Sequence, residues 1–273
     1  MIAAFFAADK AKAREKARAD AESWFSGRPA RWDLLEASTA RLREGENAIP
    51  PFHWAVEFPE VFRRENGGFD AIVGNPPFMG GRNISGSFGD AYLNWLHSSI
   101  SGSGGQTDLV AYFFRRAFAL LRSGGAAGLV ATSTIAQGDT RRSGLSAILA
   151  SGGSIYRAIK RRSWPGDASV RISIVHFVKH AEVGKYFLND LPVPMITSYL
   201  FHNGTSDEPR PLFESSGLAF KGQEPYGRGF QFSENEAGTN PLELAETLVT
   251  QNPSNLEIIH PYLGGSDTNG LWG

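Results

Sequence analysis

The sequence predicts an α/β protein built on a mostly parallel sheet. Between residues 69 and 178, short apolar runs rich in β-branched residues alternate with segments of helical periodicity. That alternation is typical of right-handed crossover connections. The composition, 41% apolar with 19 Phe in 273 residues, is sufficient for a hydrophobic core. After residue 185, prolines and glycines interrupt the pattern, so we expect a loop-rich C-terminal region.

The elements can be placed in chain order. Residues 2–23 alternate alanine with charged residues and predict a solvated helix, which a mixed connector follows. The helix at 109–121 has the strongest signal, because Thr107 or Asp108 can cap its start and Gly124-Gly125 can end it. The further elements expected are a buried strand at 69–73, a helix at 90–100, a strand at 128–132, a helix at 143–150, and strands at 154–160 and 170–178.

Charge and composition exclude several classes of function. The net charge of −1 means that any contact with nucleic acid must come from a local patch. The chain has no cysteine, and its six histidines lack the spacing of metal ligands, so no metal site is expected. No apolar run approaches the roughly 18 residues of a membrane span, and a secretory signal is missing. We therefore expect a cytoplasmic protein with no membrane partner.

A chemically distinctive loop, Asn75-Pro76-Pro77-Phe78, follows the first predicted strand. The two prolines forbid a helix and any sheet pairing through their own nitrogens. The Asn75 side-chain oxygen and the Pro76 carbonyl can accept both hydrogens of an amino group, while Phe78 offers a flat face for a planar ring. Accepting both hydrogens draws the nitrogen lone pair out of conjugation and makes the amine a nucleophile. An exocyclic amine of a base in duplex DNA becomes accessible only after the base flips out.

Three segments carry a resemblance to a known family. FDAIVGNPPF (69–78) resembles motif IV of the amino-methylating, S-adenosylmethionine-dependent DNA methyltransferases. TDLVAYFFRRAFALLRSGGAAGLVATSTIAQ (107–137) resembles motifs V and VI of the adenine-N6 enzymes in gamma motif order, and SWPGDASVRISIVHFVK (163–179) resembles motif VIII. Residues 52–62 and 261–269 look like the flanking regions of large bacterial restriction–modification and phage-defence methylases; 261–269 resembles the start of their target-recognition region.

The resemblance implies a partial Rossmann-like methyltransferase sheet and methyl transfer from S-adenosylmethionine to a flipped adenine in double-stranded DNA. It implies stacking of the base between Phe78 and Trp164, and cofactor contacts from Asn75 and from Asp108 at the motif V position. The catalytic residues that it implies are Asn75, Pro76, Pro77 and Phe78.

The same resemblance implies three parts of the chain. They are a helical segment and connector at 1–65, the catalytic half of a methyltransferase domain at 66–182, and a loop-rich region leading into target recognition at 183–273. The family's Gly-rich cofactor loop after a first strand is not found, since GSGG at 102–105 follows no predicted strand. We therefore expect an internal piece of a larger, truncated or split enzyme. It would be inactive alone, with the missing upstream half and a restriction or defence protein as partners.

Seven basic residues lie around the motif VIII segment, with Asp167 the only acid among them. They can contact phosphates beside the flipped base, and we predict Arg161 and Arg162 as DNA contacts. A solvated surface is the alternative interpretation. The seven are Arg141, Arg142, Arg157, Lys160, Arg161, Arg162 and Arg171.

Other functions stay open at this point. A protein glutamine methyltransferase uses a similar NPPY loop on a side-chain amide, although Trp164-Pro165 and the flanking segments argue against it. A cytosine-N4 enzyme is less favoured, because Ser usually replaces Asn in its motif. A catalytically incomplete remnant, or a subunit completed by another polypeptide, is the alternative from a different class. The DNA recognition sequence and the oligomeric state do not follow from the sequence.

Overall fold

The computed structural model describes residues 2–8, 10–40, 42–44, 48, 50–168, 170–208, 229, 231–234 and 237–261. The chain divides into two units, Met1–Glu208 and Pro209–Gly273. The second unit contains, in its described part, helix α11 (Leu242–Gln251) and a 3₁₀ turn (Pro253–Glu257). Residues 262–269, which carry most of the resemblance to a target-recognition region, lie outside the described residues. No helix in the described ranges combines the length and apolar character needed to cross a membrane.

The first unit begins with short helices. The single helix predicted over residues 2–23 is two helices, because α1 ends at Phe5 and α2 begins at Ala11. The connector that follows is held to the start of the sheet by aromatic rings, since Trp54, Phe58 and Phe62 all contact the ring of Phe69. The helices here are α1 (Ile2–Phe5), α2 (Ala11–Ser26), α3 (Trp32–Ala40), α4 (Trp54–Glu57) and α5 (Pro59–Phe62).

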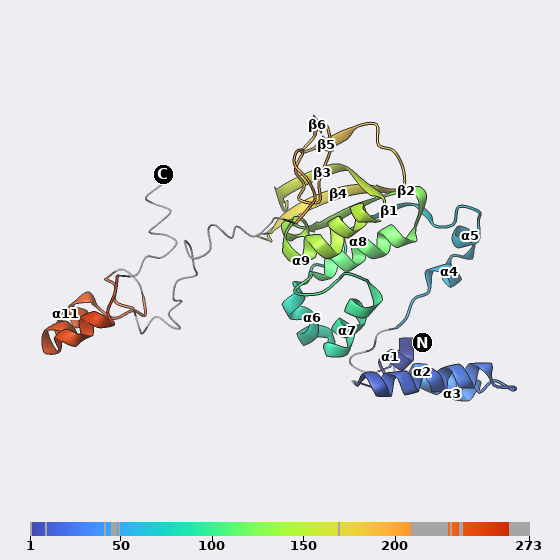
Figure 1. Cartoon of the computed structure of the whole chain (residues 1–273), viewed down its shortest axis with the longest axis horizontal. Helices are drawn as coiled ribbons and strands as arrows, with labels where there is room; N and C mark the ends of the chain where they lie inside the picture. Colours follow the sequence, from blue (N-terminus) through green and yellow to red (C-terminus); the bar gives the residue numbers. More distant parts are fainter. Residues whose placement is uncertain are drawn as a thin grey trace. The chain divides into compact units, whose positions relative to one another are not determined.

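A six-stranded mixed sheet follows, with strand order β1-β2-β4-β3-β5-β6 (Figure 1). The pairs β1–β2 and β3–β5 are parallel, and the other three pairs are antiparallel. The strands are β1 (Phe69–Gly74), β2 (Leu121–Thr132), β3 (Gly153–Ser163), β4 (Arg171–Lys179), β5 (Tyr186–Leu188) and β6 (Leu191–Val193).

The α/β class is confirmed, but a mostly parallel sheet is the wrong description. Strand β4 runs in reverse between β2 and β3, because residues 164–170 are too few for a crossover and form a hairpin instead. Strands β1, β2 and β3 still point the same way, so their carboxyl ends share one edge of the sheet. The three-part division of the chain stays a prediction; β5 and β6, from its third part, extend the sheet.

Helices cover one face of the sheet (Figure 1). Helix α8 (Leu109–Leu120) begins where the sequence predicts and ends at Leu120, before Gly124-Gly125, because β2 starts at Leu121. After β2 comes a helical segment at 138–150, made of α9 (Gly138–Arg141), a π-helical turn (Arg142–Ser146) and α10 (Ala147–Ala150). The fully buried Phe114 of α8 and Ile148 of α10 pack in one core with Phe177 of β4.

The other face of the sheet is more open. Val73 at the end of β1 is 88% exposed, and Val130, Ile174 and Val178 are half-buried. In the described part of the chain, no strand pairs with the outer side of β1, so β1 is an edge strand rather than the buried strand that its composition predicts. Strands that are apolar on both faces normally have helices on both faces. The composition of this sheet therefore suits a larger domain.

The Gly/Ser-rich stretch before α8 is more regular than its sequence predicts. Helix α7 (Asp90–Ser99) lies where a helix was expected, and α6 (Gly81–Phe88) precedes it. Gly and Ser disfavour helices, so sequence propensity gave no indication of α6. Tertiary packing stabilises it, because Ile84 is fully buried in a small core with Leu96 and Leu109.

Candidate active site

The Asn75-Pro76-Pro77-Phe78 loop leaves the sheet at the carboxyl end of β1. Gly74, the last residue of the strand, is still paired with Leu129 of β2. Asn75 is exposed to solvent, whereas Phe78 is half-buried and packs partly against the main core. The loop therefore lies at the sheet edge where such folds bind ligands, and its amide side chain is accessible.

The far end of this loop is fixed by the start of α8. The Met79 backbone N–H donates to Asp108 Oδ1 at 3.1 Å, and the Leu109 N–H donates to the Met79 carbonyl at 2.9 Å. The same Asp108 oxygen accepts from the Val110 N–H at 3.0 Å and so caps α8. Asp108 is only 7% exposed. The structure thus brings Asp108 close to the loop through Met79.

A buried polar layer lies behind Asp108. Its own N–H donates to Thr140 Oγ1 of α9 at 3.0 Å, and the hydroxyls of Thr107 and Ser143 are 2.7 Å apart. The Gln106 N–H donates to Asp139 Oδ2 at 2.9 Å. The segment before α8 is therefore attached to α9 and the π-helical turn at three successive residues.

Trp164 lies in the hairpin between β3 and β4. The backbone N–H of Trp164 donates to the Val170 carbonyl at 3.0 Å and so closes the hairpin. The residue is half-buried. A Cβ added to Gly166 would come within 2.9 Å of the indole nitrogen, so this turn needs a residue without a side chain there. The hairpin follows the carboxyl end of β3 and lies at the same sheet edge as Asn75, with β2 and β4 between them.

The seven basic residues near motif VIII separate into two groups. Four are engaged: Arg141 and Arg142 with Glu208, Arg157 with Asp190, and Lys160 with the Tyr199 carbonyl and the Phe201 ring. The other three are exposed and form no ion pair with any described residue, and they lie at the tip of the β3–β4 hairpin: Arg161, Arg162 and Arg171. The predicted DNA contacts Arg161 and Arg162 belong to this second group.

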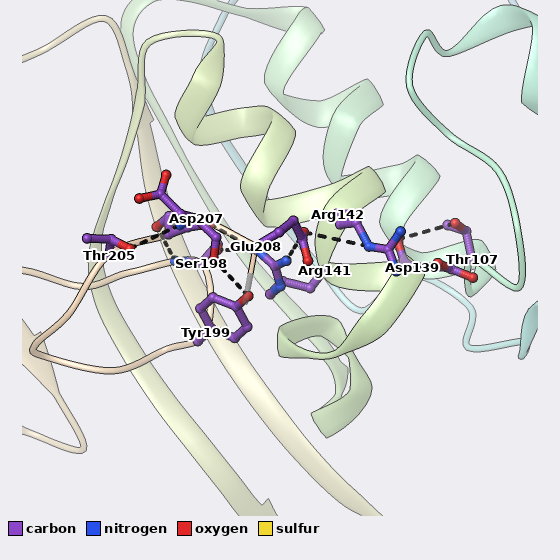
Figure 2. A network of polar contacts seen from close by, with 10 residues as sticks. Thr107, Asp139, Arg141, Arg142, Ser198, Tyr199, Thr205, Asp207 and Glu208 are labelled. Carbon is purple, nitrogen blue, oxygen red and sulfur yellow. Dashed lines mark hydrogen bonds and ion pairs between the residues drawn. The ribbon is translucent and has the colours of Figure 1, made fainter. Parts of the chain in front are cut away.

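Sequence reasoning missed the structural role of Arg141. Figure 2 shows its guanidinium reaching from α9 to the segment after β6, where it donates to Ser198 Oγ at 2.8 Å and pairs with Glu208. It also lies 3.9 Å over the centre of the Tyr199 ring, and the residue is 1% exposed. The sequence offers only a run of basic residues here, without any signal that one is buried.

A separate cavity of about 460 Å³ opens beside α7 and α8. Its lining is largely aromatic and includes Trp54, Trp95 and Phe113. Neither Asn75 nor Trp164 lines it. Within the described residues, no group of three His, Asp or Glu side chains is placed to share a metal ion.

The fold and the family comparison are those of restriction-modification methylases. In fold, the chain is similar to the type IIL restriction-modification enzyme MmeI, solved in complex with DNA, with a TM-score of 0.53 and 20% sequence identity over 72% of this chain. The M protein of the type I restriction enzyme EcoKI (TM-score 0.28, 16% identity, 41% of this chain) and a type I modification subunit from Vibrio vulnificus (TM-score 0.31, 15% identity, 66% of this chain) are weaker matches.

The family model of the Eco57I restriction-modification methylases matches residues 12–159. The chain belongs to the Eco57I restriction-modification methylase family. It spans 27% of MmeI, 21% of the EcoKI M protein and 40% of the Vibrio subunit. Comparison with curated proteins gives no match.

Proposed function

We propose that this chain is the catalytic half of an S-adenosylmethionine-dependent methyltransferase that methylates the exocyclic amine of a flipped adenine in double-stranded DNA. The observation that carries the proposal is the exposed Asn75 amide on a proline-rigid loop at the carboxyl edge of the sheet. Membership of a restriction-modification methylase family supports DNA as the substrate.

The catalytic part of the proposal concerns Asn75 to Phe78. The Asn75 side-chain oxygen and the Pro76 carbonyl accept the two hydrogens of the adenine amino group. Pro76 and Pro77 hold these acceptors in place, because each fixes its own φ angle. The ring of Phe78, half-buried against the core, and that of Trp164, in the hairpin at the same edge, would stack on the two faces of the base. Because the two acceptors are fixed before the reaction, they stabilise the developing charge without reorganisation.

One side of a cofactor site fits the residues present. Asn75 is exposed at the sheet edge, and the carboxylate of Asp108 binds the end of the same loop, with Oδ1 accepting from the Met79 and Val110 N–H groups. S-adenosylmethionine, when bound, supplies the methyl group. We assign its contacts in this chain to Asn75 and Asp108. The open outer side of β1 supports the proposal that the rest of the site comes from an upstream half that carries the Gly-rich loop.

The DNA contacts are assigned to the hairpin tip. Arg161, Arg162 and Arg171 have no anionic partner among the described residues, and they lie close in sequence to Trp164. Guanidinium groups bind phosphate oxygens bidentately. Arginines in this place can therefore bind the DNA backbone beside an extruded base. In the cell the protein would be part of a restriction–modification or phage-defence system with a nuclease or other defence partner.

The test uses the chain together with a polypeptide that supplies the Gly-rich half from another member of the family. Unmethylated bacterial DNA is incubated with isotopically labelled S-adenosylmethionine, and the digested nucleosides are identified by mass spectrometry. We expect labelled N6-methyladenine. Labelled N4-methylcytosine would instead make it a cytosine enzyme. In a parallel incubation with bacterial protein in place of DNA, label on a glutamine side chain would make it a protein methyltransferase. No transfer at all would favour a catalytically incomplete remnant.

A further inference from the structure

The catalytic loop is anchored at both ends, and Asp108 provides the second anchor. At its start, Gly74 is paired with β2. At its end, Met79 donates to Asp108 Oδ1 at 3.1 Å and accepts from Leu109 at 2.9 Å. Only residues 75–78 lie between the anchors, and two of them are prolines without an N–H. The position of the Asn75 amide therefore depends on where Met79 is held.

Asp108 suits this role because one oxygen joins two elements. Oδ1 accepts from Met79, which belongs to the loop, and from Val110, which belongs to the first turn of α8. Asp108 is buried, so water competes little for the atoms that form these hydrogen bonds. The positive end of the α8 dipole also stabilises the carboxylate there.

The layer behind Asp108 fixes it in turn. Thr140 accepts from its N–H at 3.0 Å, and Asp139 accepts from the preceding Gln106 N–H at 2.9 Å. The backbones also approach closely, because a Cβ on Gly81 would meet the Gln106 carbonyl carbon at 2.5 Å. Loop, cap and α9 are thus packed with little room for independent movement.

We propose that Asp108 is a positioning residue that sets the catalytic loop through the Met79 N–H, in addition to any contact with cofactor. The inference rests on the proposed function for its consequence, but the hydrogen bond itself can be tested in the bare chain. The role requires an acceptor oxygen at the end of a two-carbon side chain and does not require its negative charge. Asparagine can therefore replace Asp108, whereas serine is one carbon too short to reach Met79 while it still caps a helix.

The first experiment measures residue-resolved amide hydrogen exchange in the full chain. In Asp108→Ser we expect the Met79 amide to exchange about ten- to a hundredfold faster, because its part-buried N–H loses its acceptor. The amides of β4 should keep their protection, because serine preserves the cap. Asp108→Asn should keep Met79 protected. The matched control is Asp33→Ser in the first turn of α3, which should leave Met79 unchanged.

Two results would overturn the inference: unchanged exchange of Met79 in Asp108→Ser, or equal loss of protection in Asp108→Asn. In the complete enzyme, Asp108→Ser should lower kcat, and Asp108→Asn should restore kcat. If Asp108→Asn keeps Met79 protected and loses cofactor affinity, positioning stands and a cofactor contact is added to it. If the wild-type complex transfers no methyl group, the proposed function fails while the exchange result still decides the role of Asp108.

Discussion

Asn75 combines exposure with a fixed backbone, and both properties could be predicted from the sequence. An apolar run followed by Asn-Pro-Pro-Phe predicts a strand end and a loop, and the structure has both, since β1 ends at Gly74 and residues 75–80 lie in neither helix nor strand. The hydrogen bond between Asp108 and Met79 could not be predicted in this way. It joins residues 29 positions apart, and no local pattern specifies which backbone N–H a buried carboxylate will accept.

Asn75, whose side-chain amide is the proposed acceptor, is the first residue to test. In the complete enzyme, Asn75→Ala should lower the methylation rate by about a hundred- to a thousandfold and lower cofactor affinity far less, because the reacting amine then has one acceptor fewer. Single-turnover kinetics with titration of the cofactor separate the two effects. Asn94→Ala, an exposed position on α7, is the control. More than about half of the activity remaining in Asn75→Ala would remove the loop from catalysis.

The second prediction concerns the rings of Phe78 and Trp164, which should hold the flipped base. Trp164→Ala and Phe78→Leu should each weaken capture of an extruded base, since stacking contributes about 1–3 kcal/mol per base. Leucine is used at position 78 because that ring also packs on the core. Duplexes that contain 2-aminopurine, which is bright when unstacked, report the captured base. Trp32→Ala, exposed on α3, should have no effect, and an equal loss in that variant would contradict the assignment.

Among the secondary-structure elements, the β3–β4 hairpin should bind DNA through its exposed arginines. Replacing Arg161, Arg162 and Arg171 by Gln should weaken duplex binding and reduce the slope of log K against log salt by about 0.9 for each phosphate that the protein no longer neutralises. Fluorescence anisotropy across a salt series measures both. Arg157→Gln is the matched control, because its guanidinium already pairs with Asp190. An unchanged slope in the triple variant would place the DNA elsewhere.

His176 on strand β4 should make the stability of the fold depend on pH. Burial lowers the pKa of His176 below its ordinary value of 6.5, and the nearby positive charge of Arg157 acts in the same direction. The unfolded chain therefore binds a proton at higher pH than the folded chain, and stability falls as the pH drops through 6.5. Thermal unfolding between about pH 7.5 and about pH 5.5 should show a smaller decline for His176→Gln than for wild type. The exposed His202→Gln is the control, and equal declines in all three proteins would contradict this account.

Comparison of the helices and strands with the sequence shows which of them could be predicted and which could not. Strands β1, β3 and β4, the last part of β2 and helix α8 were predictable because their apolar periodicity is strong, and Asp108 supplied a recognisable cap. Strands β5 and β6 were not predicted, because prolines and glycines interrupt the pattern after residue 185. The direction of β4 depends on the hairpin at 164–170, and α6 depends on the burial of Ile84. Both are tertiary effects that override local propensity.

The sheet of the first unit has an open edge and an open face. The outer side of β1 pairs with no strand in the described ranges, and Val73 at its end is 88% exposed. Apolar strands of this kind are stable in larger sheets that have helices on both faces. This arrangement supports the proposal that a second polypeptide segment extends the sheet beyond β1 and completes the cofactor site beside Asn75.

For the isolated chain we therefore expect weak binding of S-adenosylmethionine. Asn75 and Asp108 line only one side of the proposed site, so most of the cofactor surface would stay in water and contribute little affinity. Isothermal titration calorimetry should give a dissociation constant in the millimolar range or weaker. Addition of the half that carries the Gly-rich loop should bring the dissociation constant into the micromolar range. It should also slow amide exchange in β1, because a new strand would pair with its outer side, which no strand in the described ranges contacts. Micromolar binding by the bare chain would mean that these residues already form a complete cofactor site.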